Sequence, residues 1–195
     1  MIKFGLWKDV LLNPKQTFKK EKKNANYGVA AKYVFIAGLI GGVITGLVSI
    51  STLLYDAIAT PVVALIGLFL GSGIYHLFAQ LLGGKGDYKT QTYLMALYTA
   101  PLSVIASVLS LLMGVVVLAF PFNIVVAPLL LIILGLSIYG VYLLTLLLKE
   151  VHGFNTQRAV MVWLIPFIIL TAIVAIGAYY YLYSGVISDF PIPEI

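Results

Sequence analysis

The chain has 195 residues, of which 62% are hydrophobic and only 10% are charged. A soluble domain is about 45–50% apolar and about 25% charged, and a protein of 21.2 kDa has too much surface to hide the excess from water. The mean hydropathy of +1.06 therefore excludes a soluble globular protein, a disordered tail and a fibrous repeat, and it indicates an integral membrane protein. The absence of cysteine excludes disulfides, thiolate metal sites and cysteine nucleophiles.

Residues 1–29 form a basic segment ahead of the first long apolar run. Its apolar side chains follow one stripe of a short helix, and a basic amphipathic helix with a tryptophan lies naturally in the headgroup plane. The expected membrane-surface residues are Trp7, Lys8, Lys15, Lys19, Lys20, Lys22 and Lys23. Two interpretations stay open. The segment is a functional element that senses the membrane surface or docks a partner, or it only fixes the position of the first span.

Five apolar runs follow, and each meets or exceeds the roughly 20 residues that cross a hydrocarbon core about 30 Å thick. They comprise residues 30–54, 61–82, 92–120, 125–148 and 159–183. We expect helices, because backbone groups in lipid must be paired within the segment and the runs lack the alternation of barrel strands. The predicted fold class is all-α, with a bundle of five transmembrane helices over residues 30–184 and a short tail over residues 185–195.

Turn residues predict where these helices begin. Pro61 is expected early in the second helix, where a missing N–H costs least, so residues 51–60 are expected to form a connection. Thr90 and Thr156 are expected as N-caps of the third and fifth helices. The order of proline, helix, glycine loop and Thr-Gln occurs twice. Either this is an internal repeat, or helical hairpins in general share such turn residues.

All 12 lysine and arginine residues fall on one face when the five spans are alternated across a bilayer. The opposite face, with the Asp56 connection, the turn at residues 121–123 and the C-terminal tail, receives none. Basic residues are retained on the cytoplasmic side. The distribution predicts a multi-pass protein of the cell membrane with a cytoplasmic N-terminus and an external C-terminus.

Glycines four residues apart mark two of the spans. Small residues at this spacing let helices approach closely, since lipid offers no hydrophobic drive for their association. The predicted packing residues are Gly38, Gly42 and Gly46 on the first span and Gly67 and Gly71 on the second. Packing within the bundle and a homo-oligomer interface are both open.

A search for catalytic chemistry finds no HExxH, no GxSxG and no complete phosphate loop, so we expect no enzyme, catalytic residue, cofactor or metal. Polar residues within the spans are the remaining candidates, because they are costly in lipid. They are His76 with Gln80 one turn later, and the row Thr99, Ser103 and Ser107. Either they form a polar pathway, or they bond locally and hold helices together.

Three motifs point to a family. They are Trp7-x-x-Val10-Leu11-x-Asn13-Pro14-Lys15-x-x-Phe18, then His76 with the loop Leu82-Gly83-Gly84-Lys85-Gly86-Asp87-Tyr88-Lys89, and Pro101 in the next helix. With these motifs the chain resembles the Yip family of integral membrane proteins, named for interaction with small Ypt/Rab GTPases. The resemblance covers nearly the whole chain and implies a five-helix domain with a cytoplasmic N-terminus.

Eukaryotic members of this family are implicated in vesicle traffic and membrane shaping. The long cytosolic N-terminal domain and its Asp-Leu-Tyr-Gly-Pro motif are missing here, so GTPase binding is not carried over, and the chain is similar to the compact prokaryotic branch. We expect a non-enzymatic scaffold or adaptor that acts through helix packing, lipid contact or membrane shaping. The alternative is a small transporter or channel that uses His76, Gln80 and the Ser/Thr row. The expected partners are the bilayer with its anionic lipids, a second copy or another membrane protein, and no nucleic acid.

Overall fold

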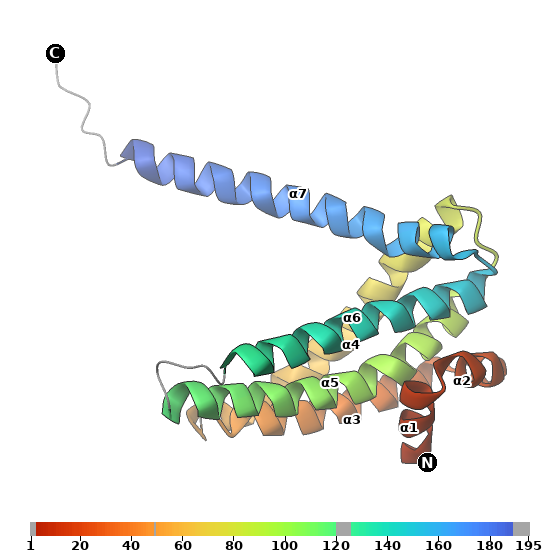
Figure 1. Cartoon of the computed structure of the whole chain (residues 1–195), viewed down its shortest axis with the longest axis horizontal. Helices are drawn as coiled ribbons and strands as arrows, with labels where there is room; N and C mark the ends of the chain where they lie inside the picture. Colours follow the sequence, from red (N-terminus) through yellow and green to blue (C-terminus); the bar gives the residue numbers. More distant parts are fainter. Residues whose placement is uncertain (1–2, 49, 120–125, 189–195) are drawn as a thin grey trace.

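The computed structural model describes residues 3–48, 50–119 and 126–188, with side chains as far as residue 181. No strand occurs within these ranges. The elements in order are α1 (Phe4–Leu12), α2 (Pro14–Glu21), η1 (Lys22–Asn24), α3 (Tyr27–Gly46), η2 (Ile50–Thr52), α4 (Leu53–Leu81), α5 (Tyr88–Ala119), α6 (Val126–His152) and α7 (Thr156–Ser188). The helices α3 to α7 are long and apolar enough to cross a membrane, which confirms the predicted all-α class with five spans (Figure 1).

The helices α3 and α4 pack against each other along three glycines of α3. A β-carbon built on Gly38 would lie 2.6 Å from Pro61 Cα, and one on Gly46 would lie 2.8 Å from Leu53 Cα. Between them, a β-carbon on Gly42 would lie 2.3 Å from the backbone oxygen of Asp56. The partner numbers fall as the glycine numbers rise, so the helices run antiparallel with their backbones in close approach.

Because of this contact, the connection between the first two spans lies earlier in the chain than the sequence predicts. The predicted first span to residue 54 is too long, because α3 ends at Gly46 and the chain has already turned into α4 at Leu53. Residues 53–60 are helical, and Pro61 lies in the third turn of α4 rather than near its start. The proline is buried against Gly38, where the missing side chain leaves room for its ring.

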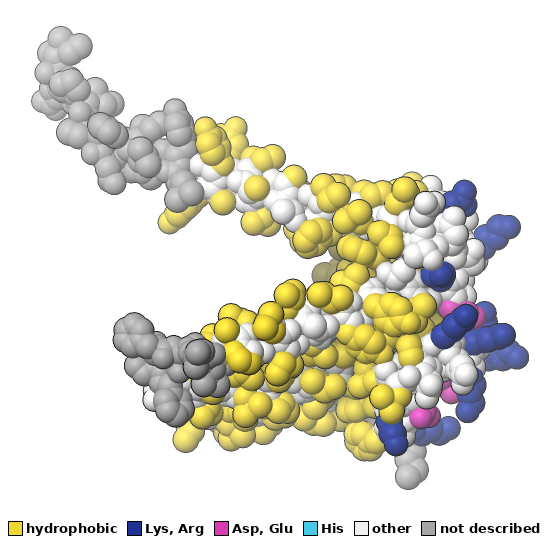
Figure 2. All heavy atoms as spheres, in the orientation of Figure 1, with side chains coloured by type: hydrophobic (Ala, Val, Ile, Leu, Met, Phe, Trp, Pro, Cys, Tyr) yellow, Lys and Arg dark blue, Asp and Glu magenta, His cyan; other side chains and the backbone are white. Residues whose placement is uncertain are grey.

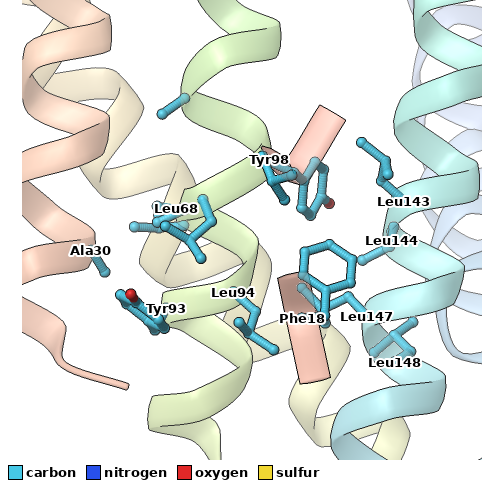
Figure 3. Close-up of a cluster of buried hydrophobic side chains, with 14 of the residues drawn as sticks. Phe18, Ala30, Leu68, Tyr93, Leu94, Tyr98, Leu143, Leu144, Leu147 and Leu148 are labelled. Carbon is cyan, nitrogen blue, oxygen red and sulfur yellow. The ribbon is translucent and has the colours of Figure 1, made fainter. Parts of the chain in front are cut away.

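The core lies around the first half of α5, which contacts α1, α3, α4 and α6. Leu94 and Leu97 of α5 are fully buried, as are Leu143 and Leu147 of α6. Figure 3 shows Leu94 on the side of α5 that faces α6. Phe18 of α2 fills the space between these two helices. The protein core is therefore concentrated towards one end of the bundle.

The N-terminal segment packs on the protein with its apolar side. Val10 and Phe18 are fully buried, and Trp7 packs against Tyr33 of α3 with ring centroids 6.2 Å apart. The hydroxyl of Tyr139 on α6 donates a hydrogen bond to the backbone oxygen of Leu11. Phe4 and Leu12 are largely exposed, so the segment presents apolar side chains both to the bundle and away from it, and its predicted contact with the headgroup plane stays a prediction.

We call the end formed by α1, α2 and the turns at residues 82–87 and 153–155 the basic end. The described lysine and arginine side chains gather there (Figure 2). The helix α7 leaves this end in contact with α4 and α6, with Ala159 and Val162 fully buried. Farther along, α7 diverges from the other helices, and residues 167–181 are exposed on every side (Figure 1).

Candidate functional site: a buried polar cluster at the basic end

The turn between α4 and α5 closes over the end of α6. Gly83 follows α4 with a φ of +83°, which only glycine adopts at little cost, and the Gly84 N–H donates to Ala79 O at 2.8 Å. A β-carbon on Gly84 would lie 2.6 Å from His152 Nδ1, and one on Gly86 would lie 2.4 Å from a methyl carbon of Val151. The glycines of this turn therefore allow its backbone to touch the last turn of α6.

His152 is the last residue of α6 and is buried beneath this turn. The backbone N–H of Gly86 donates to His152 Nδ1 at 3.2 Å, and His152 Nε2 lies 2.7 Å from Gln91 Oε1. Because the backbone N–H is only a donor and the amide oxygen only an acceptor, Nδ1 accepts and Nε2 carries the proton. The geometry thus assigns a neutral imidazole in the Nε2–H tautomer.

Gln91 of α5 connects His152 of α6 with Ser72 of α4. It is fully buried, and its Nε2 donates to the backbone oxygen of Ser72 at 2.7 Å. Ser72 Oγ lies 2.8 Å from Thr92 Oγ1, which in turn donates to Tyr88 O at 2.8 Å, so the Ser72 hydroxyl donates to Thr92. We call His152, Gln91, Ser72 and Thr92 the polar cluster. Every donor in the polar cluster has an acceptor, and the bonds join three helices. The cluster therefore fixes the positions of α4, α5 and α6 relative to one another.

The predicted pair His76 and Gln80 lies beside the polar cluster. Gln80 Nε2 and His76 Nε2 are 3.0 Å apart, and the His76 ring lies 5.5 Å from the rings of both His152 and Tyr88. With the Gln80 amide donating, His76 Nδ1 carries a proton. Among the described residues, this buried nitrogen has no hydrogen-bond partner.

The predicted Ser/Thr row lies elsewhere on α5. Thr99 Oγ1 donates to Met95 O, Ser103 Oγ to Ala100 O and Ser107 Oγ to Ser103 O, all within their own helix. Thr99 and Ser103 border a mostly apolar cavity of about 240 Å³ between α3, α4 and α5. His76 and Gln80 do not line this cavity, so the structure does not bring the two halves of the predicted pathway together.

The two predicted glycine motifs differ in their surroundings. The motif of α3 lies at the contact with α4 described above. On α4, a β-carbon on Gly67 would meet nothing within 4 Å, and one on Gly71 would meet the terminal methyl of Met95 at an ordinary 3.6 Å. Equal spacing in the sequence therefore corresponds to one close contact between helix backbones and to one looser region, where Gly71 meets only the Met95 side chain and Gly67 borders the cavity.

Sequence reasoning missed most of the polar cluster. Gln91 and His152 are 61 residues apart, and no periodic pattern links them. The available signal was the presence of uncharged polar side chains in the first turn of one apolar helix and the last turn of another. Within the described ranges, no group of three or more His, Asp or Glu side chains could hold a metal. The cluster is built from an imidazole, an amide and two hydroxyls, whose chemistry here is hydrogen bonding between helices.

The helix starts also differ from the prediction. Asp87, not Thr90, caps α5, because Asp87 Oδ1 accepts from the Thr90 N–H at 2.8 Å. Asn155, not Thr156, caps α7, with Oδ1 accepting from the Arg158 N–H at 2.9 Å. α5 thus begins at Tyr88, ahead of Thr90, and α7 begins at Thr156 itself, which is its first helical residue and not its cap. Both turns also contain a left-handed glycine, Gly83 or Gly153, so the two hairpins are closed in the same way.

Asp87 makes α5 sensitive to acid. Burial raises the pKa of its carboxyl, but the hydrogen bonds from Thr90 and the Lys89 ammonium together outweigh burial and hold the pKa below its usual value. The ionised form is therefore favoured by folding, and this stabilisation is complete above about pH 4 and is lost as the pH falls through the lower folded-state pKa. We expect Asp87→Asn to unfold with a weaker pH dependence below about pH 4, measured by circular dichroism in detergent. Asp9→Asn, which removes an exposed carboxylate from α1, is the matched control, and equal pH curves for both variants would contradict the assignment.

Fold and cluster together define a multi-pass α-helical membrane protein whose basic end is closed by hydrogen bonds between helices. A family model described as the Yip1 domain matches residues 8–179, and the chain belongs to this family. This match confirms the resemblance derived from the sequence motifs. No curated protein and no solved structure is significantly similar to the chain.

Proposed function

We propose that the chain is a non-enzymatic membrane scaffold or adaptor that acts through helix packing and contact with the surrounding bilayer. The observation that carries this proposal is the use of polar groups at membrane depth. Thr99, Ser103 and Ser107 donate to carbonyls of their own helix, and glycines rather than polar side chains mediate the close α3–α4 contact. Such packing holds a rigid shape and offers a solute no chain of free polar groups.

The proposed test is native mass spectrometry of the full chain released directly from membranes. A scaffold or adaptor is expected to retain a second copy or another membrane protein, and the spectrum reports the stoichiometry. Flux across liposomes containing the purified protein supplies the opposing test. Solute flux above that of empty liposomes, abolished by His76→Ala, would favour the alternative transporter and contradict the scaffold.

We further propose that the basic end faces the cytoplasm in the cell membrane and that the C-terminus is external. The gathering of lysine and arginine side chains at one end of the described structure supports this orientation (Figure 2). In this arrangement residues 1–29 are a cytoplasmic segment, residues 30–184 the membrane domain and residues 185–195 an external tail. The part of that tail from residue 189 lies outside the described residues.

The chain has no cysteine, so single cysteines report the orientation without background. A cysteine introduced after Ile195 is expected to react with an impermeant thiol reagent on intact cells. Lys20→Cys, at an exposed position of α2, is expected to react only after the cells are opened. The reverse pattern would overturn the proposed orientation.

A further inference from the structure

A second feature of the basic end is a cavity of about 330 Å³ between α2, the last turns of α6 and the turn into α7. None of its lining residues belongs to the polar cluster, although Phe154 stacks on the His152 ring with centroids 5.5 Å apart. Its lining combines charged side chains with apolar ones, namely Lys15, Phe18, Leu146, Lys149, Glu150 and Phe154. We call it the Lys15–Lys149 cavity.

The charges around this cavity do not cancel. Glu150 is bound by Lys22 at 2.7 Å, which is the one ion pair within the described residues. Lys149 Nζ donates to Thr156 Oγ1 at 2.8 Å, which holds the ammonium in place and leaves it two further protons to donate. Lys15 and Lys149 therefore contribute two positive charges that no acidic side chain of the described structure neutralises.

The apolar part of the lining narrows the choice of ligand. Phe18 is fully buried, Phe154 is buried, and Leu146 is half-buried on the membrane-spanning part of α6. A ligand that satisfies both parts carries an anionic group for the lysines and a short hydrocarbon portion for Leu146 and the exposed edge of Phe154, since Phe18 already packs in the core. Free phosphate would use the two cations alone and leave the apolar surface wet. The phosphate of a nucleic acid would also leave the apolar surface of the cavity without a contact.

We propose that the Lys15–Lys149 cavity binds the headgroup of an anionic phospholipid, with the phosphate between the two ammonium groups and the first acyl carbons against Leu146. The cavity lies at the basic end, where the apolar spans finish and headgroups are at hand. This binding site goes beyond the scaffold role and does not depend on it. Retention of a protein partner tests the scaffold role, and retention of lipid tests this site, so the failure of one can be distinguished from the failure of the other.

The test is lipid retention by the full chain in detergent, measured by native mass spectrometry during titration with dioleoyl phosphatidylglycerol. Each lysine beside anionic lipid contributes roughly fivefold in affinity, so the double variant Lys15→Gln/Lys149→Gln is expected to bind roughly 30-fold more weakly. The matched control is Lys19→Gln/Lys23→Gln, which removes the same charge from two exposed positions that do not line the cavity and is expected to lose clearly less affinity than the cavity variant. Equal losses in the two double variants would mean unspecific surface attraction and would overturn the site.

Two further arms identify the ligand. Dioleoyl phosphatidylcholine, with the same chains and no net charge, is expected to bind at least tenfold more weakly than phosphatidylglycerol, and equal binding would overturn the role of the lysines. Inorganic phosphate is expected not to displace the lipid at millimolar concentration, and displacement would mean a free-anion site instead.

A variant that is expected to gain binding gives a test that does not depend on interpreting a loss of binding. Glu150→Gln removes the acidic group of the cavity and frees Lys22, so it is expected to bind phosphatidylglycerol about fivefold more tightly. Unchanged or weaker binding by Glu150→Gln would contradict the proposal, even if the lysine double variant failed to fold.

Discussion

Gly42→Ala is expected to lower the free energy of unfolding by about 2–3 kcal/mol, even though alanine has the higher helix propensity by about 1 kcal/mol. The added methyl would lie 2.3 Å from the backbone oxygen of Asp56 and 2.9 Å from its carbonyl carbon. Backbone atoms cannot rotate away as a side chain does, so α3 and α4 must separate. The measurement is the unfolding midpoint in a titration with sodium dodecyl sulfate from mild detergent, followed by circular dichroism.

Gly67→Ala is the matched control for this prediction. Gly67 has the same spacing within a glycine motif, but an added methyl there would meet no atom within 4 Å. We expect its stability to be unchanged or raised by up to about 1 kcal/mol from helix propensity. Oligomeric state measured on the same samples separates the two interpretations of the α3 glycines. Loss of self-association by Gly42→Ala at unchanged monomer stability would favour an interface between copies over packing within the bundle.

Gln91→Leu is expected to destabilise the fold by about 2–3 kcal/mol, although leucine is better suited to lipid. The substitution leaves the buried His152 Nε2–H without its acceptor and removes the donor to Ser72 O, and each buried polar group without a partner costs about 1–3 kcal/mol. The same denaturant titration measures the loss. A readout specific to the polar cluster is the nitrogen chemical shift of the His152 imidazole, which is expected to show the Nε2–H tautomer in the parent and a loss of that preference in the variant.

Gln157→Leu is the matched control, since Gln157 is also in the first turn of a spanning helix but is exposed. It is expected to change stability by less than about 0.5 kcal/mol. Equal effects of the two substitutions would show that the buried hydrogen bonds of Gln91 do not matter for stability. An unchanged His152 tautomer in Gln91→Leu would contradict the assigned network itself.

The sequence was sufficient for features that depend on local composition. Hydrophobic runs longer than a bilayer core predicted five helices, and motifs containing Trp7, Pro14 and His76 predicted the family. Boundaries were less accurate where tertiary contact decided them. Pro61 looked like a helix start, but its packing against Gly38 places it within α4, because a glycine on the partner helix makes room for the ring.

The candidate site was less predictable for a similar reason. His76 and Gln80 are one helical turn apart, so their proximity follows from spacing alone. The contact of His152 with Gln91 and Gly86 instead depends on how two hairpins meet at the basic end, which no local pattern encodes. The spacing of Gly67 and Gly71 matched that of the α3 glycines, yet only the surroundings in three dimensions distinguish a close contact from a looser region.

The divergence of α7 has a consequence for its mechanics. Near Ala159 and Val162 the helix packs against protein, whereas the side chains of residues 167–181 are exposed. In a membrane, the tilt of that outer stretch is therefore governed by the order and length of the neighbouring lipid tails, as for an isolated hydrophobic helix. A change in bilayer thickness is therefore expected to tilt this stretch relative to α4 and α6, while the residues around Ala159 and Val162 stay packed.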